Sequence, residues 1–110
     1  MAKVRATIEY EDWFDGLTDG EAAAVAKAVE KLQILGTELG FPNSSALEGS
    51  RKLRELRVSK NAIRVFYAFD PARSAVLLLG ASKAGRNKKR FYREMIVRCE
   101  ALLIVYVGGK

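Results

Sequence analysis

Three apolar runs in the middle of the chain are separated by two short polar turns, residues 59–61 and 70–73. The first run ends at Val58, the second covers residues 63–69, and the third covers residues 76–79. Their β-branched, aromatic and aliphatic side chains are typical of strands. The turns contain Asn, Asp and Pro, which suit tight reversals. Because links this short favour antiparallel pairing, the pattern predicts a three-stranded antiparallel meander.

The N-terminal pattern predicts a strand followed by a short helix. Apolar and polar side chains alternate over residues 3–10, which is typical of a half-buried strand. Tyr10, Trp13, Phe14 and Leu17 then recur at the spacing of one helix face. The charged residues beside these aromatic side chains are acidic, so we expect the rings in the core rather than against nucleic acid.

A second helix is predicted to begin at a capping box formed by Thr18 and Glu21. The Ala-rich run behind it has high helix propensity and carries apolar residues at helical spacing. Gly36 is suited to end this helix. Residues 37–50 are rich in Gly, Pro, Ser and Asn, which predicts a loop that crosses to the sheet.

A final helix is predicted from about Asn87. Its apolar stripe is Tyr92, Met95, Ile96, Cys99, Leu102 and Leu103, which should pack on the sheet or on the first helices. Residues 103–107 are apolar and β-prone, and three alternatives remain for them: a frayed end, a pairing strand or a contact with a partner.

These elements predict one α+β domain over residues 1–110. The order is an N-terminal strand at the sheet edge, two helices, the antiparallel meander and a C-terminal helix. We expect the helices to cover one face of the sheet and to leave the other face concave and basic.

Charge is distributed unevenly along this chain of net charge +6. Residues 1–40 carry four Lys and Arg against eight Asp and Glu, whereas residues 41–110 carry fifteen against five. A basic second half favours a polyanionic partner, with nucleic acid the leading candidate. Uneven charge that serves only solubility is the alternative.

The N-terminus and the single cysteine indicate a cytoplasmic protein. Cys99 cannot form an internal disulfide, which favours a reducing compartment. No signal peptide is evident, and the longest apolar run, residues 101–107, is too short to span a bilayer. We therefore expect a soluble protein that makes no contact with membranes.

The absence of histidine narrows the possible chemistry. Histidine-based zinc sites and catalytic triads are excluded, and the carboxylates of the basic half are scattered, so neither a metal site nor another cofactor is predicted. Arginine and lysine remain as candidates. Arg64 lies in the most apolar strand, with Arg57 expected on the strand beside it. A cation there needs an anion or an open groove, although an ion pair with Glu55 is the structural alternative.

A basic cluster follows the last predicted strand. Six of the eleven residues from Lys83 to Arg93 are basic and none is acidic. Cations at a helix N-terminus oppose the helix dipole, whereas a bound phosphate would be favoured there. The cluster therefore favours phosphate binding, and a solvated basic face is the alternative.

The order and spacing of these features resemble the RelE/ParE toxin superfamily, and most of all its HigB-type, phage-derived branch. The resemblance rests on a strand ending in Glu-Leu-Arg (55–57), an Arg-led strand ending in Phe-Asp (64–70), and an apolar strand ending in Gly80. A Lys-rich loop and a helix containing Arg-Phe-Tyr (90–92) complete the pattern. The similarity covers roughly residues 4–103. Two features differ: RelE itself carries a lysine where Glu55 stands, and some HigB-type members use histidines that this chain lacks.

The resemblance implies a toxin of a type II toxin–antitoxin system: a ribosome-dependent mRNA endoribonuclease, or mRNA interferase. Such toxins cut messenger RNA in the ribosomal A site and are silenced by an antitoxin, usually a small helix-turn-helix protein. By the same resemblance, Arg57 and Arg64 match the arginines that hold the scissile phosphate. Lys83 matches the basic position after the last strand, and Tyr92 matches the aromatic residue near the start of the last helix. Further RNA contacts are expected from the other basic residues of this half: Arg54, Lys60, Arg86, Lys88, Lys89, Arg90 and Arg93.

Two other functions remain open, a DNA gyrase inhibitor of the ParE type and an inactive nucleic-acid-binding member of the family. For the nuclease, the RNA 2′-hydroxyl would attack the adjacent phosphate without a metal. The sequence leaves the identity of the general base undecided. Tyr92 among cations could have a lowered pKa, or could stack on a base with its hydroxyl outward, and Lys83 or Lys60 could act instead. We expect Tyr92 mainly to position the RNA.

Overall fold

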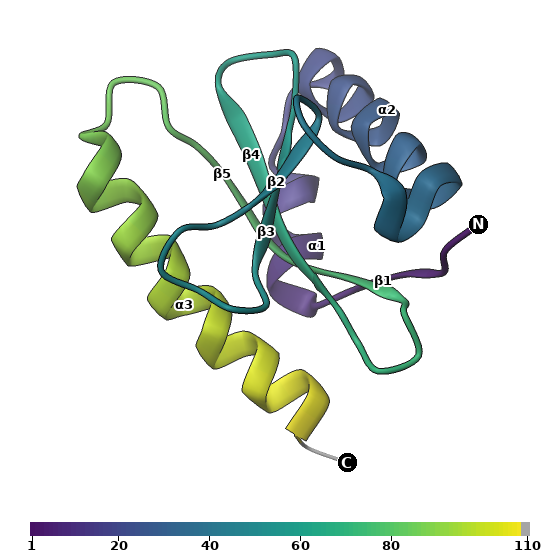
Figure 1. Cartoon of the computed structure of the whole chain (residues 1–110). Helices are drawn as coiled ribbons and strands as arrows, with labels where there is room; N and C mark the ends of the chain where they lie inside the picture. Colours follow the sequence, from purple (N-terminus) through teal and green to yellow (C-terminus); the bar gives the residue numbers. More distant parts are fainter. Residues whose placement is uncertain (109–110) are drawn as a thin grey trace.

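The computed structural model describes residues 1–108 and contains three α-helices and five strands (Figure 1). Along the chain the elements are β1 (Val4–Ala6), α1 (Ile8–Asp15), α2 (Asp19–Leu35), the 3₁₀ turn η1 (Gly36–Glu38), β2 (Ser44–Ala46), β3 (Arg54–Arg57), β4 (Ile63–Phe69), β5 (Ala75–Ser82) and α3 (Lys88–Gly108). The predicted α+β class is confirmed. Residues 109 and 110 of the predicted domain lie outside the described residues.

The strands form one mixed sheet in the order β1-β5-β4-β3-β2. Strands β3, β4 and β5 pair antiparallel in sequence, which confirms the predicted meander. Its turns form as the residue types indicate: Asn61 adopts a positive φ of 54°, and the Asp70 carboxylate accepts a hydrogen bond from the Ser74 amide. Strand β1 lies at the edge, as predicted, and pairs parallel with β5.

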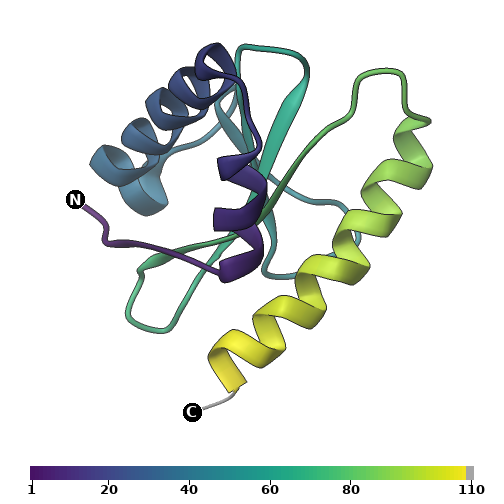
Figure 2. The same ribbon diagram turned by 180° about the vertical axis from the view of Figure 1, so that it is seen from behind.

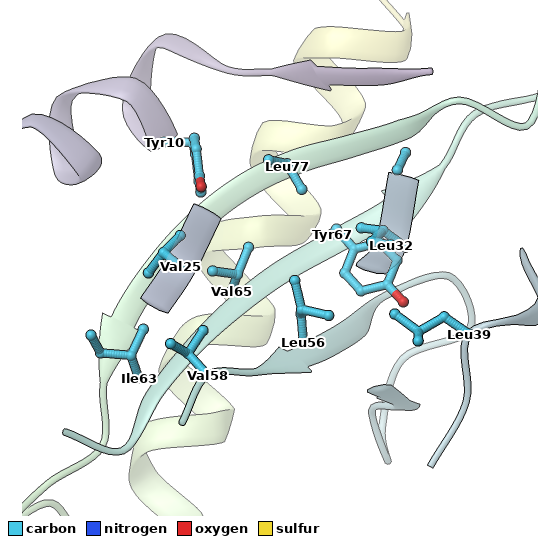
Figure 3. Close-up of a cluster of buried hydrophobic side chains, with 11 residues drawn as sticks. Tyr10, Val25, Leu32, Leu39, Leu56, Val58, Ile63, Val65, Tyr67 and Leu77 are labelled. Carbon is cyan, nitrogen blue, oxygen red and sulfur yellow. The ribbon is translucent and has the colours of Figure 1, made fainter. Parts of the chain in front are cut away.

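Helices lie on both faces of the sheet, so the predicted open basic face is wrong. One face carries α1 and α2, and its core includes Val25 of α2 together with Leu56 and Val65 of the sheet (Figure 3). On the other face, Phe91 and the buried residues that follow it at helical spacing in α3 pack against Phe66 and its neighbours. Figures 1 and 2 show α2 and α3 on opposite sides of the strands. The stripe on α3 is too apolar to remain in water, and alternation along β4 supplies a second apolar face for it.

The first helix begins earlier than the alternation over residues 3–10 predicted. Strand β1 ends at Ala6, and Thr7 caps α1, because its hydroxyl oxygen accepts a hydrogen bond from the Tyr10 amide at 3.0 Å. The same hydroxyl donates to the Leu78 carbonyl at 2.7 Å, so it ties the cap to β5. This buried hydroxyl both donates and accepts a hydrogen bond. The helix therefore begins directly after Thr7, although the alternating pattern continues to residue 10.

The second helix forms as predicted, whereas the loop behind it does not stay irregular. Thr18 and Glu21 make both hydrogen bonds of the capping box, and Gly36 ends α2 with a positive φ of 57°. Within residues 37–50, however, Ser44–Ala46 form strand β2 against β3. The buried Ser44 side chain is hydrogen-bonded to the Tyr67 hydroxyl, which fixes this short edge strand.

The end of the chain is helical, so a pairing strand at residues 103–107 is wrong. Helix α3 continues to Gly108, with Leu103 buried against the sheet and Ile104 and Val105 exposed. The β-prone residue types are overridden because the helical register puts Leu103 in line with Cys99 and Met95. Among residues 1–108, no helix combines the length and apolar character needed to cross a membrane.

Candidate active site at one end of the sheet

Pairing between β3 and β4 brings the predicted arginines together. Arg57 lies directly opposite Arg64, and Glu55 lies opposite Phe66. Because side chains alternate along a strand, Glu55, Arg57 and Arg64 all lie on the face that α3 covers. The β3–β4 turn and the β5–α3 loop meet at this end of the sheet (Figure 1), where the Lys83 amide donates to the Ala62 carbonyl at 3.0 Å.

A buried carboxylate stands at the centre of the cluster. The Glu55 side chain is 8% exposed, and its Oε2 lies 3.3 Å from Nη2 of Arg57. Its Oε1 lies 3.4 Å from Nε of Arg64 and accepts a 2.6 Å hydrogen bond from the Tyr92 hydroxyl. Two cations and a phenol therefore converge on one carboxylate, and the ion pairs with Glu55 that the sequence left as an alternative do form.

Arg64 is held in place but is not fully bonded. Its side chain is 13% exposed, and its Nη1 donates to the Ile63 carbonyl at 3.0 Å. Its buried Nε has no hydrogen-bond partner among the described residues, because the 3.4 Å approach to Glu55 lacks hydrogen-bond geometry. A guanidinium with N–H donors left over beside its ion pair favours an oxygen anion.

Arg57 is more exposed, at 31% of its side chain, and is held by several acceptors. Its Nη1 donates to the Pro42 carbonyl at 2.8 Å, and its Nη2 donates to the Ser45 hydroxyl at 3.1 Å and to Glu55. These contacts fix the guanidinium at the solvent side of Glu55, where it can meet a ligand without moving.

Tyr92 differs from expectation in two ways. Burial, and then its hydrogen bond to Glu55, raise the pKa of Tyr92 to about 12, so the lowered pKa that its cationic surroundings suggested is wrong. The hydroxyl is also not directed outward, since it donates to Glu55. The ring packs edge-on against Phe66 and Phe91, and the Lys83 ammonium lies 5.8 Å from its centroid. Tyr92 is thus a protonated donor at neutral pH.

Lys83 completes the four residues of the predicted catalytic set. Burial, followed by the positive charge of Arg64, lowers the pKa of Lys83. An ammonium whose pKa is lowered gives up its proton more readily than an ordinary lysine. The structure therefore gathers Arg57, Arg64, Lys83 and Tyr92 around Glu55.

Two of the predicted RNA contacts lie away from this cluster. Arg54 points to the opposite face of the sheet, where its Nε donates to the Tyr67 hydroxyl at 3.3 Å. Alternation along β3 requires this, since Arg54 and Arg57 are an odd number of residues apart. Lys60 lies against Gly20 at the start of α2, close to Glu21.

The other predicted contacts lie in the first turns of α3 or, for Arg86, in the loop just before it. Lys88, Lys89 and Arg93 line a hollow of about 560 Å³ that also includes Tyr92. Arg90 is exposed in the first turn, with its amide capped by Asn87. Arg86 is paired with Glu94 at 2.7 Å and lies over the Phe91 ring, so its charge is partly neutralised.

The sequence singled out Glu55 as an ion-pair partner and as a position that differs from RelE, but did not predict its central place in the cluster. The signal was present in the alternation, since Glu55 is the one acidic residue of β3 and points to the same face as Arg57. Within residues 1–108, no three Asp, Glu, Cys or His side chains lie together as a metal-binding group would require.

A family model of phage-derived Gp49-like proteins matches residues 12–103. The chain belongs to this family. The match spans the cluster described above, from the aromatic residues of α1 to Leu103 in α3. Membership of the Gp49-like family agrees with the phage-derived branch that the sequence features resembled.

Relatives of this Gp49-like chain carry the names of toxins. HigB3 of Mycobacterium tuberculosis is 42% identical over 86 residues, which is 76% of this chain and 75% of that protein. HigB2 of the same organism is 38% identical over 79 residues, covering 67% of this chain and 39% of that protein. The chain is therefore a HigB-type toxin of a toxin–antitoxin system.

Solved structures place the same Gp49-like chain in the RelE fold. The isolated RelE toxin of E. coli superposes with a TM-score of 0.63 at 11% identity, over 89% of this chain and 98% of that chain. RelE in the intact E. coli RelBE toxin–antitoxin complex gives a TM-score of 0.62 at 10% identity, over 74% and 96% of the two chains. Identities this low establish the shared fold alone.

Proposed function

We propose that this HigB-type toxin is a ribosome-dependent endoribonuclease that cuts messenger RNA in the A site without a metal. The observation that carries the proposal is the convergence of Arg57, Arg64 and Tyr92 on the buried Glu55 carboxylate, with Lys83 beside them. A carboxylate can accept a proton and cations can stabilise a phosphorane, which are the two needs of attack by a 2′-hydroxyl.

The scissile phosphate binds between Arg57 and Arg64. The Arg64 guanidinium supports this placement, because beside its ion pair with Glu55 its one hydrogen bond among the described residues goes to the Ile63 carbonyl, which leaves other N–H groups for phosphate oxygens. Arg57 reaches the same region from the exposed side. Both guanidinium groups then oppose the negative charge that grows on the phosphate oxygens in the transition state.

Proton transfer is assigned to Glu55 and Lys83. The 2′-hydroxyl gives its proton to the Glu55 carboxylate as the 2′-oxygen bonds to phosphorus. The bond from phosphorus to the 5′-oxygen breaks, and the Lys83 ammonium gives that oxygen a proton. The products are a 2′,3′-cyclic phosphate and a 5′-hydroxyl. The raised pKa of Tyr92 supports a different part for the phenol, which orients Glu55 and supports the RNA.

Partners and location follow from this activity. Because RelE in the structural neighbours is bound to RelB antitoxins, we assign this toxin an antitoxin partner, of the helix-turn-helix type that the sequence resemblance implies. Its substrate is messenger RNA on the ribosome, which places its action in the cytoplasm. The basic hollow of Lys88, Lys89 and Arg93 extends the RNA contact beyond the reacting phosphate.

Pulse labelling in cells that express the toxin without antitoxin tests the proposal. Protein synthesis should stop first, while DNA synthesis continues. Collapse of DNA synthesis with translation intact would identify a gyrase inhibitor and end the nuclease proposal. Growth and labelling that stay normal with the folded protein present would indicate an inactive family member.

Two lysine substitutions refine the same experiment. Arg64→Lys keeps the charge but loses the planar donors, so toxicity should disappear. Arg54→Lys is the matched control, since Arg54 is also a half-buried strand arginine but lies on the opposite face of the sheet. Thermal melting of both variants confirms that each is folded. Equal toxicity of the two would remove Arg64 from the site.

A further inference from the structure

The aromatic ring of Phe41 stands in solvent beside the proposed phosphate site. The residue is 81% exposed, and its ring centroid lies 5.4 Å from the guanidinium carbon of Arg57. The other strongly exposed large apolar residues of the described chain are aliphatic or Met: Met1, Ile8, Ile34, Leu35, Val97, Ile104 and Val105. Phe41 is therefore unusual both in chemistry and in place.

The loop that carries Phe41 is fixed on both sides of the ring. Leu39 before it is buried in the core, and Ser44 after it is fully buried and bonded to the Tyr67 hydroxyl. The Ser44 amide donates to the Gly40 carbonyl at 3.0 Å, and Arg57 donates to the Pro42 carbonyl. The ring is thus held out by an anchored loop, so little ordering is needed for a ligand to use it.

Arg57 connects this ring to the reacting groups. One of its nitrogens binds the Pro42 carbonyl next to Phe41, and another lies 3.3 Å from Glu55. A phosphate bound between Arg57 and Arg64 is separated from a neighbouring base by one sugar. Because Arg57 lies against the Phe41 ring, a base on this side of the phosphate would come within reach of that ring.

We propose that Phe41, packed against Arg57, is a stacking surface for a nucleobase of single-stranded RNA next to the cleaved phosphate. This inference rests on the proposed function and deepens it. Aromatic rings bind unpaired bases by stacking, and a cation beside the ring favours the attached phosphate. The position next to phosphate-binding arginines favours RNA over a protein partner.

Fluorescence of Phe41→Trp tests the surface without any need for cleavage. The wild-type chain has a single tryptophan, Trp13 of α1, which packs over Gly80 of β5. Wild-type protein is therefore the control for the signal of the new indole. A short single-stranded RNA should quench the new indole with saturation, while inorganic phosphate and ribose 5-phosphate should not. Absence of quenching by RNA, or equal quenching by ribose 5-phosphate, overturns the proposal.

Cleavage of ribosome-bound message gives the second measurement. Phe41→Ala should lower kcat/KM on the order of tenfold to a hundredfold, the range expected for one stacked base. Phe41→Tyr should retain it, and Ile34→Ala, an exposed apolar truncation on α2, should cleave as wild type. Phe41→Ala with wild-type cleavage overturns the proposal. A Phe41→Ala variant that cleaves normally but no longer binds its antitoxin also overturns the proposal, since the ring would then contact protein.

Failure of the two proposals can be distinguished. If wild-type toxin cleaves nothing while RNA still quenches Phe41→Trp, the stacking surface stands and the nuclease assignment falls. If Arg64→Lys is inactive while Phe41→Ala cleaves as wild type, the nuclease stands and the stacking surface falls.

Discussion

Arginines of one sheet have different surroundings depending on the face to which they point. Arg54 bonds a core tyrosine on the α2 face, whereas Arg57 and Arg64 meet Glu55 on the α3 face. Under the proposed mechanism, only the second pair lies where a phosphate would also meet a proton acceptor and Lys83. Strand alternation, rather than the number of cations, therefore decides which basic residues belong to the site.

The Glu55 assignment predicts the effect of a neutral substitution. Glu55→Gln keeps the shape of the side chain but removes the proton acceptor, so cleavage should fall by about 10²–10⁴. Glu30→Gln, an exposed carboxylate on α2, serves as the control and should cleave normally. Single-turnover cleavage of ribosome-bound message measures both. If Glu55→Gln cleaves well while Glu55→Ala does not, Glu55 positions the arginines and takes no proton.

Tyr92 should tolerate loss of its hydroxyl but not of its ring. Its pKa of about 12 keeps the phenol protonated, so it cannot serve as a base near neutral pH. Tyr92→Phe loses the hydrogen bond to Glu55 but keeps the ring, so it should retain most cleavage, and Tyr92→Ala should lose cleavage. A Phe variant as inactive as the Ala variant would show that the hydroxyl takes part in the chemistry.

Most elements could be predicted from the sequence because their signals are local. The capping box at Thr18, the meander turns and the α3 stripe each rest on residues close in the chain. The errors arise where distant residues decide: Thr7 caps a helix with help from Leu78, and β2 forms because Tyr67 binds Ser44. Among the site residues, the arginines followed from spacing and resemblance, whereas the central place of Glu55 depended on a pairing register.

Helix α1 is held to the sheet by a close approach at Gly80. A Cβ built there would lie 2.3 Å from ring carbons of Trp13, too close for any side chain. Gly80→Ala should therefore lower the free energy of unfolding by about 1–3 kcal/mol, the usual cost of overpacking. Urea unfolding measures the loss, and Trp13→Leu in the same chain should recover part of it.

Gly40→Ala is the control for this substitution, because nothing lies within 4 Å of a Cβ there and no positive φ is required. The urea midpoint of Gly40→Ala should stay at the wild-type value. Equal midpoints for Gly80→Ala and Gly40→Ala would show that Trp13 does not pack on Gly80.

At the scale of the whole molecule, two buried acidic groups, the Tyr10 phenol and the Cys99 thiol, should make the fold sensitive to alkali. Burial raises the pKa of Tyr10 from 10.0 to about 12 and that of Cys99 from 9.0 to about 12. The unfolded chain loses these protons first, so stability is full below pH 9 and falls as the pH rises toward 12. The buried Tyr10 alone should account for roughly 2–3 kcal/mol of this loss.

Urea midpoints from pH 7 to pH 11.5 measure the alkaline loss. Tyr10→Phe removes one titrating group, so its stability curve should be flatter than that of wild type between pH 10 and 11.5. Curves that run parallel over this range would show that Tyr10 ionises equally in both states.

The most direct test of the central claim is cleavage of one ribosome-bound message that carries a single deoxynucleotide. The cut site is first mapped with purified toxin and an all-ribose message, and the 2′-hydroxyl is then removed at that position only. The ribose message should be cut in the A site to give a 2′,3′-cyclic phosphate and a 5′-hydroxyl, and the deoxy message should remain intact. Cleavage of the deoxy message at the same bond, or no cleavage of either by folded toxin, would contradict the account.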